Sequence, residues 1–127
     1  MSAILKELKY TPSHEWIKEE DGLTVVGLSD FAQNALGDIV FINLPEEGSE
    51  VTAGEAFADV ESVKAVSDVF SPVTGVVAAV NEELLDNPAL VNEAPYESWL
   101  IKVSDVSETR ELLDADAYGE VCAAEED

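Results

Sequence analysis

The chain has few of the side chains that bind metals or form cross-links. Cys122 is its only cysteine and cannot form an internal disulfide, and His14 is its only histidine. A structural zinc site in a single chain is therefore excluded, and we expect no metal. We assign His14 a structural or surface role and no catalysis, because the sequence offers no nucleophile and base in a recognisable arrangement around it.

Long apolar runs are also missing. No stretch of about eighteen apolar residues is present, so we expect no transmembrane helix and no membrane partner. The first residues lack the basic end and the long apolar stretch of a signal peptide. We therefore expect a cytoplasmic protein.

Basic residues are scarce. Six Lys and Arg stand against 28 Asp and Glu, a formal net charge of −22. The hydrophobic fraction of 46% nevertheless argues against disorder, and the 127 residues fit a single domain. Such acidity disfavours nucleic acid as a partner. It fits either a halophilic protein from a salt-rich cytoplasm or a surface that attracts basic partners, and both interpretations stay open.

Short β-favouring runs separated by turn residues predict a mostly β fold. Residues 15–18 and 23–27 are two such runs, and the segment between them ends in Asp-Gly, which is typical of a hairpin. Residues 39–44 form a continuous β-favouring run, for which we predict a fully buried strand. Residues 99–103 form a closing strand. Turns recurring at such short intervals indicate a sandwich or a barrel.

Helical periodicity is confined to short segments. Ser29 or Asp30 can cap a short helix that exits at Gly37, and residues 82–95 predict a loop with a short helical turn. Apolar residues take a helical period near the end of the chain. We therefore predict a core over residues about 7–106 and a helical tail over about 107–124, with Ser107 as a possible cap and Cys122 packed inward.

Lys64 is the only basic residue between Lys18 and Lys102. If its segment were one strand, Val63 and Ala65 would point inward and Lys64 outward. Lys64 would then be either a solubilising edge residue or an attachment point, and the spacing leaves both open. A weak similarity between residues 51–60 and 73–80 would place Lys64 in a turn between two similar halves.

Six ordered segments resemble the H protein family of the glycine cleavage system. They are residues 10–16 (Tyr-Thr-Pro-Ser-His-Glu-Trp), 36–41 (Leu-Gly-Asp-Ile-Val-Phe), 44–48 (Leu-Pro-Glu-Glu-Gly), 60–65 (Val-Glu-Ser-Val-Lys-Ala), 71–75 (Ser-Pro-Val-Thr-Gly) and 90–96 (Leu-Val-Asn-Glu-Ala-Pro-Tyr). The resemblance runs from about residue 7 to residue 122. One departure is Ser98, where the family usually has Gly.

The resemblance implies a hybrid barrel-sandwich related to lipoyl and biotinyl domains, with lipoate in amide linkage to Lys64. In this family the arm receives an aminomethyl group after the P protein, the glycine decarboxylase, has decarboxylated glycine. The T protein, an aminomethyltransferase, then releases ammonia and passes the one-carbon unit to tetrahydrofolate. Dihydrolipoyl dehydrogenase reoxidises the dithiol. The resemblance thus implies a carrier that is not itself an enzyme, with a lipoate-attaching enzyme as a further partner, and we expect a monomer.

Three other residues are candidates for the same site. The resemblance suggests that Glu61 and Ser62 belong to the surface that the lipoate-attaching enzyme recognises; alternatively they are simply polar hairpin residues. Glu15 is a candidate for a groove that shelters the arm, because its carboxylate can face a cationic aminomethyl nitrogen. The alternative is a solvated surface carboxylate.

Other functional classes fit less well. Biotin carriers usually flank their lysine with methionines, whereas this chain has only Met1. Lipoyl domains of 2-oxo-acid dehydrogenases are closer, but they are normally shorter and tethered to a catalytic domain. An enzyme using Lys64 would need a desolvated pocket with converging polar groups. An H-like protein that donates or relays lipoate stays open.

Overall fold

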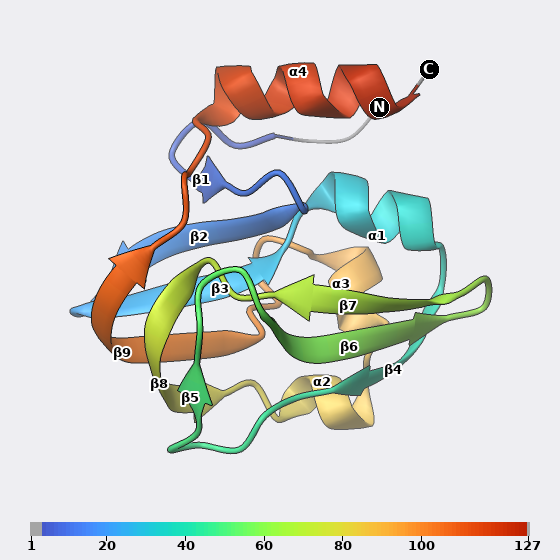
Figure 1. The fold of residues 1–127 in the computed structure, drawn as a ribbon. Helices are drawn as coiled ribbons and strands as arrows, with labels where there is room; N and C mark the ends of the chain where they lie inside the picture. Colours follow the sequence, from blue (N-terminus) through green and yellow to red (C-terminus); the bar gives the residue numbers. More distant parts are fainter. Residues whose placement is uncertain (1–3, 127) are drawn as a thin grey trace.

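The computed structural model describes residues 4–126 as two antiparallel sheets with short helices around them (Figure 1). The six-stranded sheet has the order β1-β2-β3-β9-β8-β5 and the three-stranded sheet the order β4-β6-β7. The strands are β1 (Lys9–Tyr10), β2 (Glu15–Glu20), β3 (Leu23–Leu28), β4 (Ile39–Asn43), β5 (Glu50–Val51), β6 (Ala56–Ser62), β7 (Val66–Phe70), β8 (Val73–Val80) and β9 (Ile101–Thr109). The helices are α1 (Asp30–Leu36), α2 (Glu83–Asp86), α3 (Leu90–Glu93) and α4 (Ala115–Glu126). The predicted mostly β class with a C-terminal helix is confirmed, and the two sheets do not close into one barrel.

The hairpin predicted around Asp-Gly joins β2 to β3. Its two central residues, Asp21 and Gly22, have φ angles of 53° and 79°. Positive φ at both positions is the geometry that matches the twist of paired strands, and Asp-Gly adopts it readily. Glu20 consequently pairs with Leu23, and the register places Trp16 opposite Gly27. A Cβ on Gly27 would lie 2.5 Å from the Trp16 indole, so the close packing requires glycine there.

Two clusters of buried side chains form the core. The larger lies between the sheets and includes Val26, Ile42, Val60 and Ile101. The smaller lies under α4, which covers the β1 end of the large sheet in Figure 1, and contains Tyr10, Trp16, Tyr118 and Cys122. Cys122 is buried, as predicted from its place on the helical stripe. Its side chain therefore contributes to the packing of the smaller cluster.

Helix α1 follows the predicted boundaries. Ser29 is the cap, because its hydroxyl accepts a hydrogen bond from Ala32 N at 3.2 Å. Gly37 ends the helix with φ 78° and ψ −155°, a conformation open essentially to glycine alone. The segment predicted as a loop with one helical turn contains two short helices, α2 and α3. Just beyond them the buried Ser98 donates a hydrogen bond to Leu90 O at 2.9 Å.

The prediction of a fully buried strand over residues 39–44 is wrong. In β4 Ile39 and Ile42 are buried, whereas Val40 is 54% and Phe41 45% exposed. The three-stranded sheet covers the core with one face only, so its strands alternate between inward and outward side chains. The register also shifts between Ile39 and Phe41, which is the mark of a β-bulge.

The predicted start of the C-terminal helix is also wrong. Ser107 belongs to β9, which ends at Thr109. Thr109 pairs with Val73 of β8. Helix α4 begins only at Ala115, where the Asp114 carboxylate accepts a hydrogen bond from Ala117 N at 2.8 Å. The strand pairing thus overrides the local helical period. Over the part of the chain that the structure describes, no helix has the combined length and apolar character needed to cross a bilayer.

Candidate functional site

Lys64 lies in the tight turn between β6 and β7. The turn protrudes at the right-hand edge of the molecule in Figure 1. The predicted alternation does not extend through it: Val63 is 68% exposed, and Ala65 is exposed as well. The reason is that the strand ends at Ser62, whose N–H donates to Ala65 O at 2.8 Å and closes the turn. The structure instead agrees with the alternative prediction, in which a turn carries Lys64 away from the sheet.

The Ser62 hydroxyl holds this turn from within. It accepts hydrogen bonds from Lys64 N at 3.2 Å and Ala65 N at 3.1 Å, and lies 3.2 Å from Ala65 O, to which it can donate. A serine hydroxyl that bonds to the following backbone amides is a common way to stabilise a turn. Ser62 therefore stabilises the turn through its side-chain hydroxyl, which bonds to the backbone of Lys64 and Ala65. Glu61, one residue earlier, pairs with Phe41 on one side and Val66 on the other.

The turn is attached to the corner at which α1 ends. Val63 N donates a hydrogen bond to Asp38 O at 3.0 Å. The stem of Lys64 lies over Gly37, so that a Cβ there would be 3.4 Å from Lys64 Cε. Gly37 therefore has two roles: it allows the backbone conformation that ends α1, and it leaves room for the stem of Lys64.

Asn92 stabilises the same corner, and sequence reasoning assigned it no role. Its side-chain amide donates to Gln33 Oε1 and to Gly37 O, both at 2.9 Å, while its Oδ1 accepts from Ile39 N at 2.9 Å. One side chain of α3 therefore fixes the end of α1 to the start of β4. An asparagine in a loop-like segment carries no local signal of such long-range contacts.

A groove of about 130 Å³ runs beside this corner. Helix α1 provides one wall and strands β6 and β7 the other. Its apolar lining residues are Leu28, Ala32, Ala35, Leu36, Val60 and Val69, and its polar ones Ser13, His14, Glu15, Ser67 and Asp68. Leu36 immediately precedes Gly37, so the groove begins next to the stem of Lys64. Its volume is below the roughly 300–1,000 Å³ typical of pockets that enclose a whole drug-sized ligand. The groove therefore suits the end of a long, narrow group.

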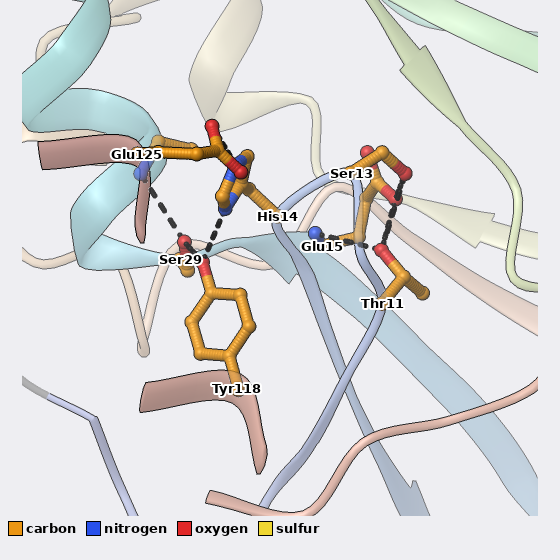
Figure 2. A network of polar contacts seen from close by, with 8 residues as sticks. Thr11, Ser13, His14, Glu15, Ser29, Tyr118 and Glu125 are labelled. Atoms are coloured by element: carbon orange, nitrogen blue, oxygen red, sulfur yellow. Dashed lines mark hydrogen bonds and ion pairs between the residues drawn. The ribbon is translucent and has the colours of Figure 1, made fainter. Parts of the chain in front are cut away.

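Glu15 is buried in the wall of this groove and is only 1% exposed, which excludes a solvated surface carboxylate. Its Oε1 accepts hydrogen bonds from the hydroxyls of Thr11 at 2.5 Å and Ser13 at 2.6 Å (Figure 2). Its Oε2 accepts a longer one from Phe70 N at 3.4 Å. Burial raises the pKa of Glu15 above its usual value, although these hydrogen bonds and the charge of Arg110 act to lower it. The Oε2 oxygen keeps acceptor capacity for a further donor.

His14 has a structural environment, as predicted. Its φ of 76° bends the chain before β2. Nδ1 lies 2.8 Å from the Tyr118 hydroxyl, and Nε2 3.0 Å from the Glu125 carboxylate (Figure 2). The ring also stacks on Phe31, with 4.7 Å between centroids. These contacts connect α4 to the mouth of the groove. Within residues 4–126 no group of three or more possible metal ligands lies together.

A larger depression of about 800 Å³ lies between β1, β2 and the far end of β9. It shares no lining residue with the groove beside Lys64, and Lys9 and Lys18 are among its own. Its buried polar lining residue is Thr24, whose hydroxyl donates to Glu19 Oε2 at 2.7 Å, and its described lining residues include no buried carboxylate comparable to Glu15. We therefore place the candidate site at the smaller groove.

The fold and the site define a class: mostly β proteins that display one lysine at a hairpin turn beside a small groove. The model of the family described as "Glycine cleavage H-protein" matches residues 8–125. The chain therefore belongs to the glycine cleavage H-protein family.

Individual relatives agree with this assignment. The glycine cleavage system H protein of Lachnoclostridium phytofermentans is 56% identical over 118 residues, covering 92% of this chain and 93% of its own. That of Halalkalibacterium halodurans is 54% identical over 128 residues, covering 98% and 100%. The crystal structure of a glycine cleavage system H protein from Mycobacterium marinum superposes with a TM-score of 0.86 at 38% identity, covering 97% and 99%.

Proposed function

We propose that this chain is the lipoyl-bearing shuttle of a glycine cleavage system and that Lys64 is its attachment point. The observation that carries the proposal is the display of Lys64. It is the one basic residue between Lys18 and Lys102, and it stands exposed in a turn that Ser62 and Asp38 hold in place. The family membership gives this display its biochemical meaning.

The surroundings of Lys64 fit an amide-linked lipoyl group. Among the described residues Lys64 takes part in no ion pair. Gly37 leaves room along the stem, and the groove with its apolar lining starts at the neighbouring Leu36. When bound, a lipoyl group supplies a cyclic disulfide that can be opened by reduction and closed again by oxidation. The chain supplies the anchor, the orientation of the stem and the sheltering groove.

Four partners follow from this role. They are the P protein, the T protein, dihydrolipoyl dehydrogenase and the lipoate-attaching enzyme. The chain itself catalyses none of their reactions; it keeps a tethered cargo at high effective concentration near each of them in turn. The proposed carrier works as a monomer, because a turn that must enter several active sites has to remain accessible.

The groove would shelter the end of the arm between these encounters. The apolar walls suit the hydrocarbon part, and the Oε2 oxygen of Glu15 offers an acceptor to an amine at the far end. Exchange of Glu15 for Gln keeps the shape but removes the negative charge. We expect the loaded arm of this variant to hydrolyse faster, measured as ammonia release from the isolated protein. An unchanged lifetime would remove Glu15 from the site.

The attachment point is tested by Lys64→Arg, which keeps the positive charge but removes the nucleophilic amine. We expect a folded protein whose mass does not change after incubation with the lipoate-attaching enzyme. It should also fail to support glycine cleavage when mixed with the other components. The matched control is Lys102→Arg on β9, which should be modified and active like the wild type. Glycine cleavage by the Lys64 variant would refute the assignment.

A further inference from the structure

An exposed apolar patch surrounds the turn that carries Lys64. Among the described residues the exposed large apolar side chains are Val40, Phe41, Val63, Val66, Leu85 and Val106. The first four belong to the three-stranded sheet and its β6–β7 turn, Val40 and Phe41 on β4, Val63 in the turn and Val66 at the start of β7, and we call them the apolar patch. Their exposed fractions are 54%, 45%, 68% and 65%. Grouped exposed apolar side chains commonly mark an interaction site, whereas scattered ones do not.

The strand register explains why these side chains point away from the core. Ile42, Val60 and Ser67 are aligned across the three strands, and the first two are buried. The next aligned row, Phe41–Glu61–Val66, therefore faces outward, because neighbouring residues of a strand point to opposite faces. Phe41 and Val66 thus lie on the outer face, on either side of Glu61.

The charges around the patch have one sign. Asp59 lies two residues before Glu61 in β6 and pairs with Asp68, which lies two residues after Val66 in β7, so this pair is on the same outer face as Glu61. No Lys or Arg other than Lys64 occurs between residues 19 and 101, which include the whole three-stranded sheet. A protein that covers the apolar patch must therefore bring basic side chains to its rim. A second copy of this chain does not meet that condition, since each copy has a net charge of −22.

We infer that the apolar patch, with its acidic rim, is the docking surface for the enzyme that attaches the acyl group to Lys64. The inference rests on the proposed function of Lys64. The attaching enzyme must bring its reactive centre to Nζ at the end of a short stem, so it has to contact the turn and the flanking Val63 and Val66. Partners that act on the far end of a long arm need not approach the turn so closely. The occupant is a protein whose active-site entrance has an apolar surface edged with Lys and Arg.

The test compares rates of acyl attachment to the apo protein, followed by intact mass. Val66→Thr keeps the β-branched shape and removes the apolar character, and Phe41→Ser removes the ring. The matched controls are Val106→Thr on β9 and Leu85→Ser on α2, which change exposed apolar side chains outside the patch. We expect the patch variants to raise KM by about 5- to 30-fold, as loss of a central interface side chain does. The controls should stay within about twofold.

A second variant tests the charge. Glu61→Gln should slow attachment at low salt, and the difference from the wild type should shrink as salt screens the rim. Circular dichroism and melting curves establish that each variant is folded. Equal rates for the patch variants and their controls would overturn the docking inference while leaving the proposed function intact. A wild-type chain that is never modified at Lys64 would instead refute the proposed function. Concentration-dependent self-association that is lost in Phe41→Ser would assign the patch to a dimer and overturn the inference.

Discussion

The Ser62 hydroxyl offers a quantitative test of how the turn presents Lys64. In Ser62→Ala the amides of Lys64 and Ala65 lose an acceptor at 3.2 and 3.1 Å, whereas the bond from Ser62 N to Ala65 O is kept. Net contributions of single hydrogen bonds are about 0.5–1.5 kcal/mol. Because the turn is exposed, water replaces the lost acceptor in part. We therefore expect a total loss of no more than about 1.4 kcal/mol.

This loss acts on the order of the turn and not on the core. A free-energy change of about 1.4 kcal/mol corresponds to a tenfold change in an equilibrium, so the ratio of ordered to disordered turn falls by up to about tenfold, and the ordered fraction falls by at most that factor. If the attaching enzyme binds only the ordered turn, its apparent affinity falls by the factor by which the ordered fraction falls. KM should rise accordingly, and kcat should stay unchanged.

The assay measures lipoate attachment to the apo protein by intact mass, with KM and kcat determined separately. Ser62→Thr serves as the matched variant, because it keeps a hydroxyl at the same position. We expect KM to rise up to about tenfold for Ala and to stay near wild type for Thr. The reasoning would be refuted by an unchanged KM in Ser62→Ala or by an equal defect in both variants. A loss of kcat alone would show that the enzyme itself contacts the hydroxyl.

Three further predictions concern stability. Burial raises the pKa of Glu15, so the folded chain takes up this proton at higher pH than the unfolded chain, whose value is near 4.5. The free energy of unfolding of the wild type should therefore fall as pH rises from about 4.5 through the folded pKa of Glu15. Glu15→Gln should lack the part of this fall that is due to Glu15. If urea unfolding gives wild type and Glu15→Gln the same dependence of stability on pH, the prediction is contradicted. Tyr118→Phe should cost about 1–3 kcal/mol in urea unfolding, because the buried hydroxyl contacts Ser29 at 2.6 Å and His14 at 2.8 Å, and a loss below about 0.5 kcal/mol would refute that role. Under the proposed salt adaptation, the melting temperature followed by circular dichroism should rise steeply from dilute buffer to molar salt; a flat response would leave attraction of basic partners as the meaning of the charge.

Local patterns predicted the features that depend on neighbouring residues. Asp21 and Gly22 adopt positive φ with little strain, so the hairpin between β2 and β3 could be located from two residues. The cap at Ser29 and the glycine exit at Gly37 are local for the same reason. Cys122 was correctly placed inside because it shares a helical stripe with Tyr118. The ordered motifs around Lys64 predicted the family, which the comparisons then confirmed.

Features that depend on distant segments were mispredicted or missed. Phe41 has the apolar character of a core residue, but it lies on the outer face of a sheet that covers the core on one side only. Ser107 looked like a helix cap, yet the pairing of β9 with β8 keeps that segment extended. The three hydrogen bonds of Asn92 join α3 to the α1–β4 corner and have no counterpart in local sequence.

The features of the candidate site also fall into those that local sequence predicts and those that depend on distant segments. The sequence by itself determined that Lys64 is an isolated amine in an acidic chain, that a mostly β fold surrounds it, and which family its motifs resemble. Only the tertiary structure decided that the strand stops at Ser62, that Glu15 is buried in a groove, and that Phe41 and Val66 flank Glu61 on the outer face of the sheet. The physical reason is that hydrogen bonds between distant strands set the register and the buried face, and no short window of residues contains both partners.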